Sequence, residues 1–128
     1  MSRTVQINAP VYVTSSFAQV TAVRSFDGVY QNTSPGPRLV SVCAGTLTPN
    51  TQGAATPWIS PDAIQEPVNW YRVGADYFSY FTGGPNLFHT QSFIVPPGWY
   101  YKLSRMVTAT IIEWAEWDFY AVQNEMEA

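Results

Sequence analysis

The sequence predicts an all-β protein, a single antiparallel β-sandwich domain with a jelly-roll-like arrangement of strands. Three observations predict this fold class. Apolar and polar residues alternate with a period of two along several runs, which is the pattern of strands buried on one face. Turn-forming residues separate these runs about every 8–12 positions, as in sandwiches of short strands. No segment shows a sustained 3.6-residue apolar period with helix caps.

The first predicted strand covers residues 4–14. Val5, Ile7 and Val13 fall on one face of it, and mostly polar residues fall on the other. Pro10 lies on the polar face, and a proline cannot donate a backbone hydrogen bond to a neighbouring strand. We therefore expect either an edge strand or a break between two short strands at this point.

Further β-like runs follow, most of them rich in β-branched or aromatic residues. They cover residues 17–24, 29–30, 38–47, 68–73, 77–82, 87–95, 99–104, 106–112 and 113–126. Residues 113–126 are also the nearest helix candidate, but the aromatic residues from Trp117 to Tyr120 favour a strand. Because Trp114 and Trp117 stand three residues apart, we expect a β-bulge or a tight bend between them.

Glycine and proline mark the connections between the predicted strands. The clearest are Asp27-Gly28, residues 34–37, Gly74-Ala75-Asp76 as a hairpin turn, residues 83–86, and Pro96-Pro97-Gly98. Apolar residues alternate on both sides of the last of these turns. Phe93 and Val95 stand two residues apart before it, and after it the same spacing holds for Trp99, Tyr101 and Leu103. This corner is therefore expected to set the register of a core hairpin.

A long surface loop is predicted over residues 49–66, which are rich in proline and polar residues. Trp58 and Ile59 form an apolar island within it, which suggests one short strand or anchor. Loops of this length in compact domains are often functional.

Composition favours a subunit of an assembly. Charged residues make up 12% of the 128-residue chain, against about 25% in ordinary soluble domains, and aromatic residues make up 16%. Large aromatic side chains are enriched at protein interfaces. The net charge is −3 and the six Lys and Arg residues are dispersed, so we expect no nucleic-acid binding. With Cys43 as the only cysteine, an intrachain disulfide and a cysteine-based metal site are excluded.

The N-terminal residues lack an apolar signal core, and no run approaches about 18 apolar residues. We therefore expect no membrane partner and a chain made and kept in the cytoplasm, unless a particle carries it out.

The densest group of acidic residues is Glu113, Glu116 and Asp118. Two carboxyl groups about 5–9 Å apart across a cleft can serve as the acid and base of a glycosidase. Simple alternation explains the same spacing, with Glu116 and Asp118 on the solvent face opposite Trp117 and Phe119. The sequence therefore predicts no catalytic residue, no cofactor and no metal ligand.

Aromatic residues also gather in the region predicted to form a hairpin. They are Trp70, Tyr71, Tyr77, Phe78, Tyr80 and Phe81, and they occupy both parities. Three explanations stay open: the hairpin is enclosed in the core, one face docks on a partner, or exposed rings stack on sugars.

Three segments resemble small virion proteins of tailed bacteriophages. They are residues 30–33 leading through Pro37 into residues 39–42, residues 93–101, and residues 111–116. The resemblance implies a β-sandwich structural subunit of a phage head or tail, often trimeric and without catalytic residues. The most specific expectation is a capsid decoration (cement) protein, a homotrimer that bridges capsomers in the virion and contacts the major capsid protein or another virion protein.

Two alternatives remain: a tail, collar or fibre-associated subunit, and a carbohydrate- or receptor-binding β-sandwich. We expect the N-terminal arm, about residues 1–9, to reach neighbouring subunits. The predicted interface residues are Val5, Ile7, Trp58, Ile59, Tyr77, Tyr80 and Trp99.

Overall fold

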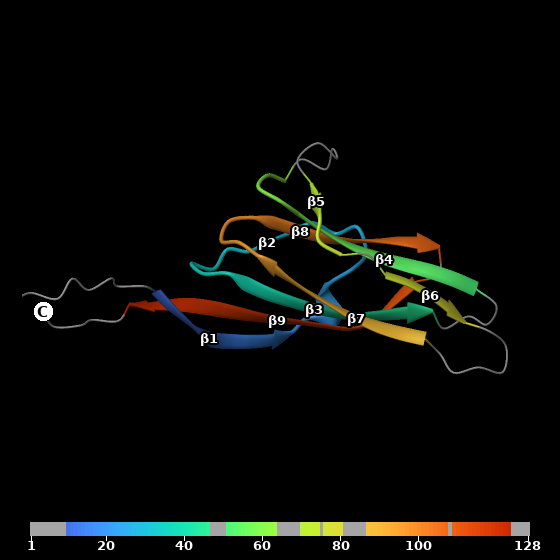
Figure 1. Ribbon diagram of the computed structural model, residues 1–128, viewed down its shortest axis with the longest axis horizontal. Helices are drawn as coiled ribbons and strands as arrows, with labels where there is room; N and C mark the ends of the chain where they lie inside the picture. The colour runs from blue at the N-terminus through green and yellow to red at the C-terminus, as the bar shows by residue number, and fades with distance from the viewer. Residues whose placement is uncertain are drawn as a thin grey trace, which may run out of the picture.

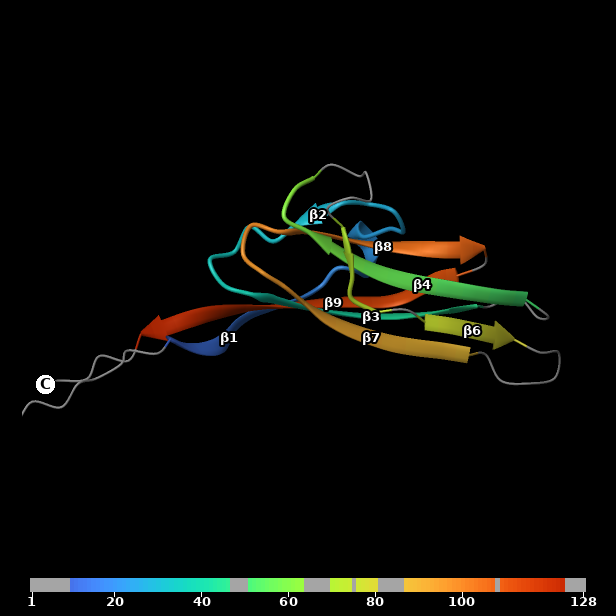
Figure 2. The same ribbon diagram turned by 45° about the horizontal axis from the view of Figure 1, so that its top comes forward.

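Two antiparallel β-sheets pack face to face in the computed structural model of the chain (Figure 1, Figure 2). The structure describes residues 10–46, 51–63, 70–74, 76–80, 87–107 and 109–123. Among these residues the only helix is a short 3₁₀ turn, η1 (Thr21–Val23), so the predicted all-β antiparallel sandwich is confirmed. The predicted N-terminal arm, with Val5 and Ile7, lies outside the described residues.

The run predicted over residues 87–95 is confirmed as one strand, whereas the runs predicted over residues 106–112 and 113–126 are divided differently, between the end of one strand and a single long one. The strands are β1 (Pro10–Gln19), β2 (Tyr30–Gln31), β3 (Arg38–Thr46), β4 (Thr51–Ser60), β5 (Tyr71–Arg72), β6 (Asp76–Tyr80), β7 (Leu87–Val95), β8 (Tyr100–Val107) and β9 (Ala109–Gln123). A four-stranded sheet has the order β1-β9-β3-β7. A five-stranded sheet has the order β2-β8-β4-β5, and β6 also pairs with β4. The strand predicted over residues 17–24 is interrupted, because η1 follows the end of β1.

The core lies between the two sheets and is built by alternating side chains. Val40, Val42 and Ala44 on β3 are at most 2% exposed, as their shared parity predicted. Tyr101 and Leu103 on β8 belong to the same buried cluster. Burial of apolar surface contributes about 25 cal/mol per Å², so this contact between the layers is the main source of stability.

A β-bulge in β9 sets which of its side chains face the core. Cys43 of β3 pairs with Glu113, but the next residue, Ala44, pairs with Ile111. Ile112 is therefore the extra residue of a bulge. The sequence prediction of a bulge or bend between Trp114 and Trp117 is wrong, since the pairing with β3 is regular there. No bulge is needed, because two residues three positions apart on a regular strand face opposite sides. Trp114 is buried in the core, and Trp117 packs against Phe17 outside it.

The predicted loop over residues 49–66 contains the strand β4 instead, and β4 lies between β8 and the short strands β5 and β6. β4 contains Pro57, and proline is unfavourable in a central strand because it has no N–H to donate. The structure resolves this conflict. The carbonyl of Pro57 faces β5 and accepts a hydrogen bond from the N–H of Val73 at 3.0 Å. Since the N and C=O of a strand residue point to the same side, the ring nitrogen also faces away from β8.

Two predicted hairpins are absent from the described sheets. β5 and β6 both pair with β4, so the turn near Gly74 does not join paired strands. The corner at residues 96–99 is a turn, but it crosses from β7 in one sheet to β8 in the other. The Trp99 N–H donates to the Pro96 carbonyl at 3.1 Å, and Gly98 has φ +81°. These are the features of a type II turn.

We expect Gly98→Ala to lower the free energy of unfolding by about 1 kcal/mol, because an alanine at positive φ is strained. No atom lies within 4 Å of the position that a Cβ would take at Gly98, so only the backbone contributes. Gly98→Asn serves as the control, since asparagine tolerates this conformation better, and it should lose less. Chemical denaturation measures both values. Equal losses in the two variants would contradict the turn assignment.

Candidate functional site

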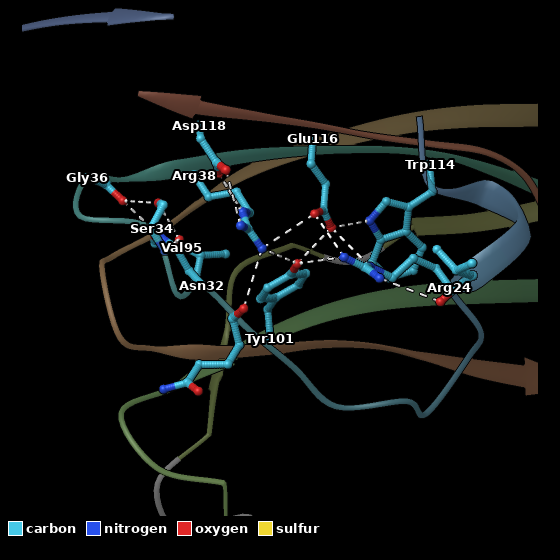
Figure 3. Close-up of polar contacts among 12 residues, drawn as sticks. Arg24, Asn32, Ser34, Gly36, Arg38, Val95, Tyr101, Trp114, Glu116 and Asp118 are labelled. Atoms are coloured by element: carbon cyan, nitrogen blue, oxygen red, sulfur yellow. Dashed lines mark hydrogen bonds and ion pairs between the residues drawn. The ribbon is translucent and has the colours of Figure 1, made fainter. Parts of the chain in front are cut away.

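A cluster of charged and aromatic side chains lies between the sheets and centres on the Glu116 carboxylate (Figure 3). Glu116 is on β9 and is only 6% exposed. Its Oε2 accepts hydrogen bonds from the Tyr101 hydroxyl at 2.7 Å, the Trp114 Nε1 at 2.9 Å and the Arg24 Nε at 3.2 Å. Its Oε1 accepts from the Arg24 Nη2 at 3.0 Å and lies 3.5 Å from the Arg38 Nη1.

The period of the strand explains how this cluster forms. Trp114, Glu116 and Asp118 stand at two-residue intervals on β9, so they share the inner face. Arg38 on β3 pairs in register with Asp118, which places the two charges side by side. Tyr101 comes from β8, in the other sheet. Its bond to Glu116 therefore joins the two layers.

Arg38 links the two carboxylates of the cluster. Its Nε donates to Asp118 Oδ1 at 2.6 Å and its Nη2 donates to Oδ2 at 3.2 Å, a bidentate pair. Its Nη1 donates to the Tyr101 hydroxyl at 3.0 Å. Two arginines thus balance two carboxylates, which is the condition under which buried charges are tolerated.

Aromatic rings close the cluster around Arg24. The guanidinium carbon of Arg24 lies 4.3 Å from the centre of the Tyr30 ring, a cation–π contact. The Tyr30 ring centre lies 5.8 Å from those of both Tyr101 and Trp114. Packing among these rings leaves the Arg24 side chain only 16% exposed, and an ion pair is stronger where water has little access.

Burial governs the ionisation of Tyr101. Its side chain is fully buried, and burial together with the neighbouring Glu116 charge raises the pKa of Tyr101 to about 12. The hydroxyl therefore stays protonated at neutral pH. It accepts a hydrogen bond from Arg38 and donates one to Glu116.

The placement of Glu116 corrects the sequence prediction that it faces solvent opposite Trp117. The sequence prediction took Trp117 as the inward-facing residue, which placed Glu116 and Asp118 on the solvent face. In the structure Trp114 faces the core, and Glu116 lies on the same face of the strand. The sequence did not indicate that Arg24 and Arg38 would contact Glu116, because they lie 92 and 78 residues away from it in the chain. The described side chains have no buried polar atom without a hydrogen-bond partner. Both carboxylate oxygens of Glu116 accept hydrogen bonds within the cluster.

A second polar centre lies at the same end of the sandwich and depends on Asn32, which is fully buried. Its Nδ2 donates to the carbonyls of Gly36 at 2.9 Å and Val95 at 3.0 Å, and its Oδ1 accepts from the Ser34 hydroxyl at 2.6 Å (Figure 3). Its backbone exchanges hydrogen bonds with Gly98 and Trp99. Asn32 thus joins the loop before β3 to the corner between β7 and β8.

The predicted interface residues are spread over the fold. Trp58 is half-buried on β4, and its Nε1 donates to Ser104 Oγ at 2.9 Å. Ile59 and Trp99 both pack partly against the core. Tyr77 and Tyr80 belong to β6, opposite Ala54 and Thr51 of β4, and their side chains lie outside the described part of the chain.

No family model matches the sequence, and no curated protein or solved structure matches it either. Within the described ranges, no helix has the length and apolar character needed to cross a membrane. The described side chains also form no group of three or more His, Cys, Asp or Glu suited to a metal ion. The resemblance to phage virion proteins stays a prediction from sequence motifs.

We expect stability to fall as the pH rises from about 10 to about 12, the interval between the ordinary pKa of tyrosine and that of folded Tyr101. In this interval the folded state holds the proton more tightly than the unfolded state. The loss should reach about 2–3 kcal/mol. Denaturation midpoints measured across this range test it.

Tyr101→Phe should remove this component of the pH dependence, while Tyr100→Phe, on the opposite face of β8, should retain it. A Tyr101→Phe variant with the same alkaline loss as the wild-type chain would contradict the assignment.

Proposed function

We propose that this chain is a structural protein of a tailed-bacteriophage virion, a capsid decoration (cement) protein that forms a homotrimer and bridges capsomers. A tail, collar or fibre-associated subunit is the nearest variant of this proposal. The work of such a protein is to hold surfaces together, and its proposed partners are two further copies of itself and the major capsid protein or another virion protein.

The observation that carries the proposal is a β-ribbon that extends beyond the sandwich (Figure 1, Figure 2). Residues 10–13 of β1 pair with residues 120–123 of β9, whereas the pairing of β9 with β3 stops at Asp118. An isolated two-stranded ribbon is only marginally stable in water. A neighbouring subunit that covers this ribbon, or adds a strand to its edge, would stabilise it.

Strand order supports a virion protein. β1, β3, β7 and β9 belong to one sheet, while β2, β4, β5, β6 and β8 belong to the other. The chain thus crosses repeatedly between the layers, and we infer that this order is that of a jelly roll. Double-sheet jelly rolls recur in viral capsid and lectin domains. A fold alone does not assign a function, so the ribbon and the saturated charge cluster carry the choice of assembly over catalysis.

A carbohydrate- or receptor-binding module is the second candidate, and one aromatic pair favours it. Tyr71 is 57% exposed, and its ring centre lies 6.2 Å from that of Trp99. Such a pair can stack on the apolar faces of sugar rings. Sugar-dependent quenching of tryptophan fluorescence would favour this candidate, because subunit assembly does not produce it.

We expect the purified chain to sediment as a trimer over a wide concentration range. Ala121→Asp, in the ribbon opposite Tyr12, should weaken association at least about tenfold, because it adds a charge that an interface would have to desolvate. Ala22→Asp adds the same charge at an exposed position in η1 and should leave the trimer intact. A chain that stays monomeric at every concentration would contradict the proposal.

Electron micrographs of particles carrying a label fused to this chain would locate it. We expect label on the head surface at positions between capsomers. Label confined to the tail would favour the tail variant, and particles without label would contradict a virion protein altogether.

A further inference from the structure

The outer face of the four-stranded sheet carries a shallow groove of about 210 Å³. Phe17 and Trp117 form its aromatic end, with ring centres 5.0 Å apart, and Phe17 is 59% exposed. Ala115 and Ser41, paired in register, line the middle, and Glu113 lines the other end. None of these side chains belongs to the charge cluster between the sheets.

An apolar row continues from the aromatic end across the whole sheet. Phe17 pairs with Trp117, Trp117 pairs with Leu39, and Leu39 pairs with Ile94 on β7. Ile94 is 50% exposed. One line of apolar side chains therefore spans the four strands next to the groove, and contiguous exposed apolar surface of this kind marks sites of interaction.

The bulge at Ile112 gives the groove its acidic end. The extra residue shifts the alternation by one position: Ala109 and Ile111 face inward before it, and Trp114 faces inward after it, so that Glu113 faces outward. The Gln19 amide donates to Glu113 Oε1 and orients the carboxylate. Among the described residues no lysine, arginine or histidine pairs with Glu113, whereas Glu116 and Asp118 are both paired.

We propose that this groove binds an extended segment of a second virion protein, which presents a lysine or arginine to Glu113 and an apolar side chain to the Phe17–Trp117 pair. Charge complementarity carries this choice of occupant: no cation of the described residues forms an ion pair with Glu113, the chain has a net charge of −3, and a cation on the partner would complete the pair. The inference rests on the proposed function, because it names the chemistry of the partner in the assembly.

Geometry fixes the spacing of the two side chains. Glu113 and Trp117 are four residues apart on β9, or about 13 Å in an extended strand. An extended partner running alongside β9 therefore needs its basic and apolar residues four positions apart.

The test uses a capped pentapeptide made of leucine, three serines and lysine in that order, titrated into the ¹⁵N-labelled full chain. We expect saturable shifts of the Glu113 and Ala115 amide signals and of the Trp117 indole N–H. A second peptide with norleucine in place of lysine should bind about two- to fivefold more weakly at low salt, since it keeps the stem and loses the charge. Equal binding of the two peptides would overturn the proposal.

Two matched variants separate this groove from general charge effects. Glu113→Gln should abolish the preference for lysine over norleucine. Asp27→Asn removes one charge at an exposed turn outside the groove, and asparagine suits its φ of 63°, so this variant should keep the preference. Retained preference in Glu113→Gln, or lost preference in Asp27→Asn, would overturn the assignment.

The outcome is distinguishable from that of the assembly proposal. If the chain is a trimer on phage heads but its groove does not prefer the lysine peptide, only the proposed peptide site is refuted. A strictly monomeric chain whose groove selects lysine would refute the cement proposal and leave the groove as a site for basic peptides.

Discussion

The Glu116 carboxylate is a charge enclosed between two β-sheets, and the arrangement of the surrounding elements depends on how that charge is compensated. An uncompensated buried charge costs several kcal/mol. Compensation comes from both layers and from the loop after η1: Tyr101 on β8, Trp114 on the same strand as Glu116, and Arg24. Arg38 then couples this carboxylate to Asp118. Tyr101 is the donor from the other sheet, so a shift of one layer relative to the other would break its bonds with Glu116 and Arg38, and these bonds oppose such a shift.

The two faces of the four-stranded sheet differ in the side chains that they present. Asn32 holds the corner between β7 and β8 at the end where Arg38 and Asp118 meet. On the inner face, the buried polar side-chain atoms of the described residues all have hydrogen-bond partners. The outer face carries the exposed Glu113 carboxylate, the Phe17–Trp117 pair and the ribbon of β1 and β9. Exposed apolar side chains on this face, such as Phe17 and Ile94, are suited to contact with another protein, which is why we favour an assembly role.

The sequence predicted those strands in which apolar residues occupy only one parity, because the buried face is then unambiguous. β3 and β7 were found because Val40, Val42 and Phe93 mark the buried parity without ambiguity. β4 was missed because Pro57 carries a local signal against a central strand, and only its tertiary setting makes it acceptable. Glu116 was placed outside because aromatic residues occupy both parities of β9, so hydrophobicity alone could not identify the inner face. The ion pairs join residues far apart in the chain, and no local pattern encodes such a contact.

The central claim is that Glu116 acts as a structural charge, and the most direct test compares two isosteric substitutions on β9. Glu116→Gln should lower the free energy of unfolding by about 3 kcal/mol, because Arg24 and Arg38, whose side chains are only 16% and 13% exposed, both lose this carboxylate. Glu113→Gln, three residues away on the exposed face, should change it by no more than about 0.5 kcal/mol. Chemical denaturation of both variants gives the comparison. A small and equal change in the two would contradict the account.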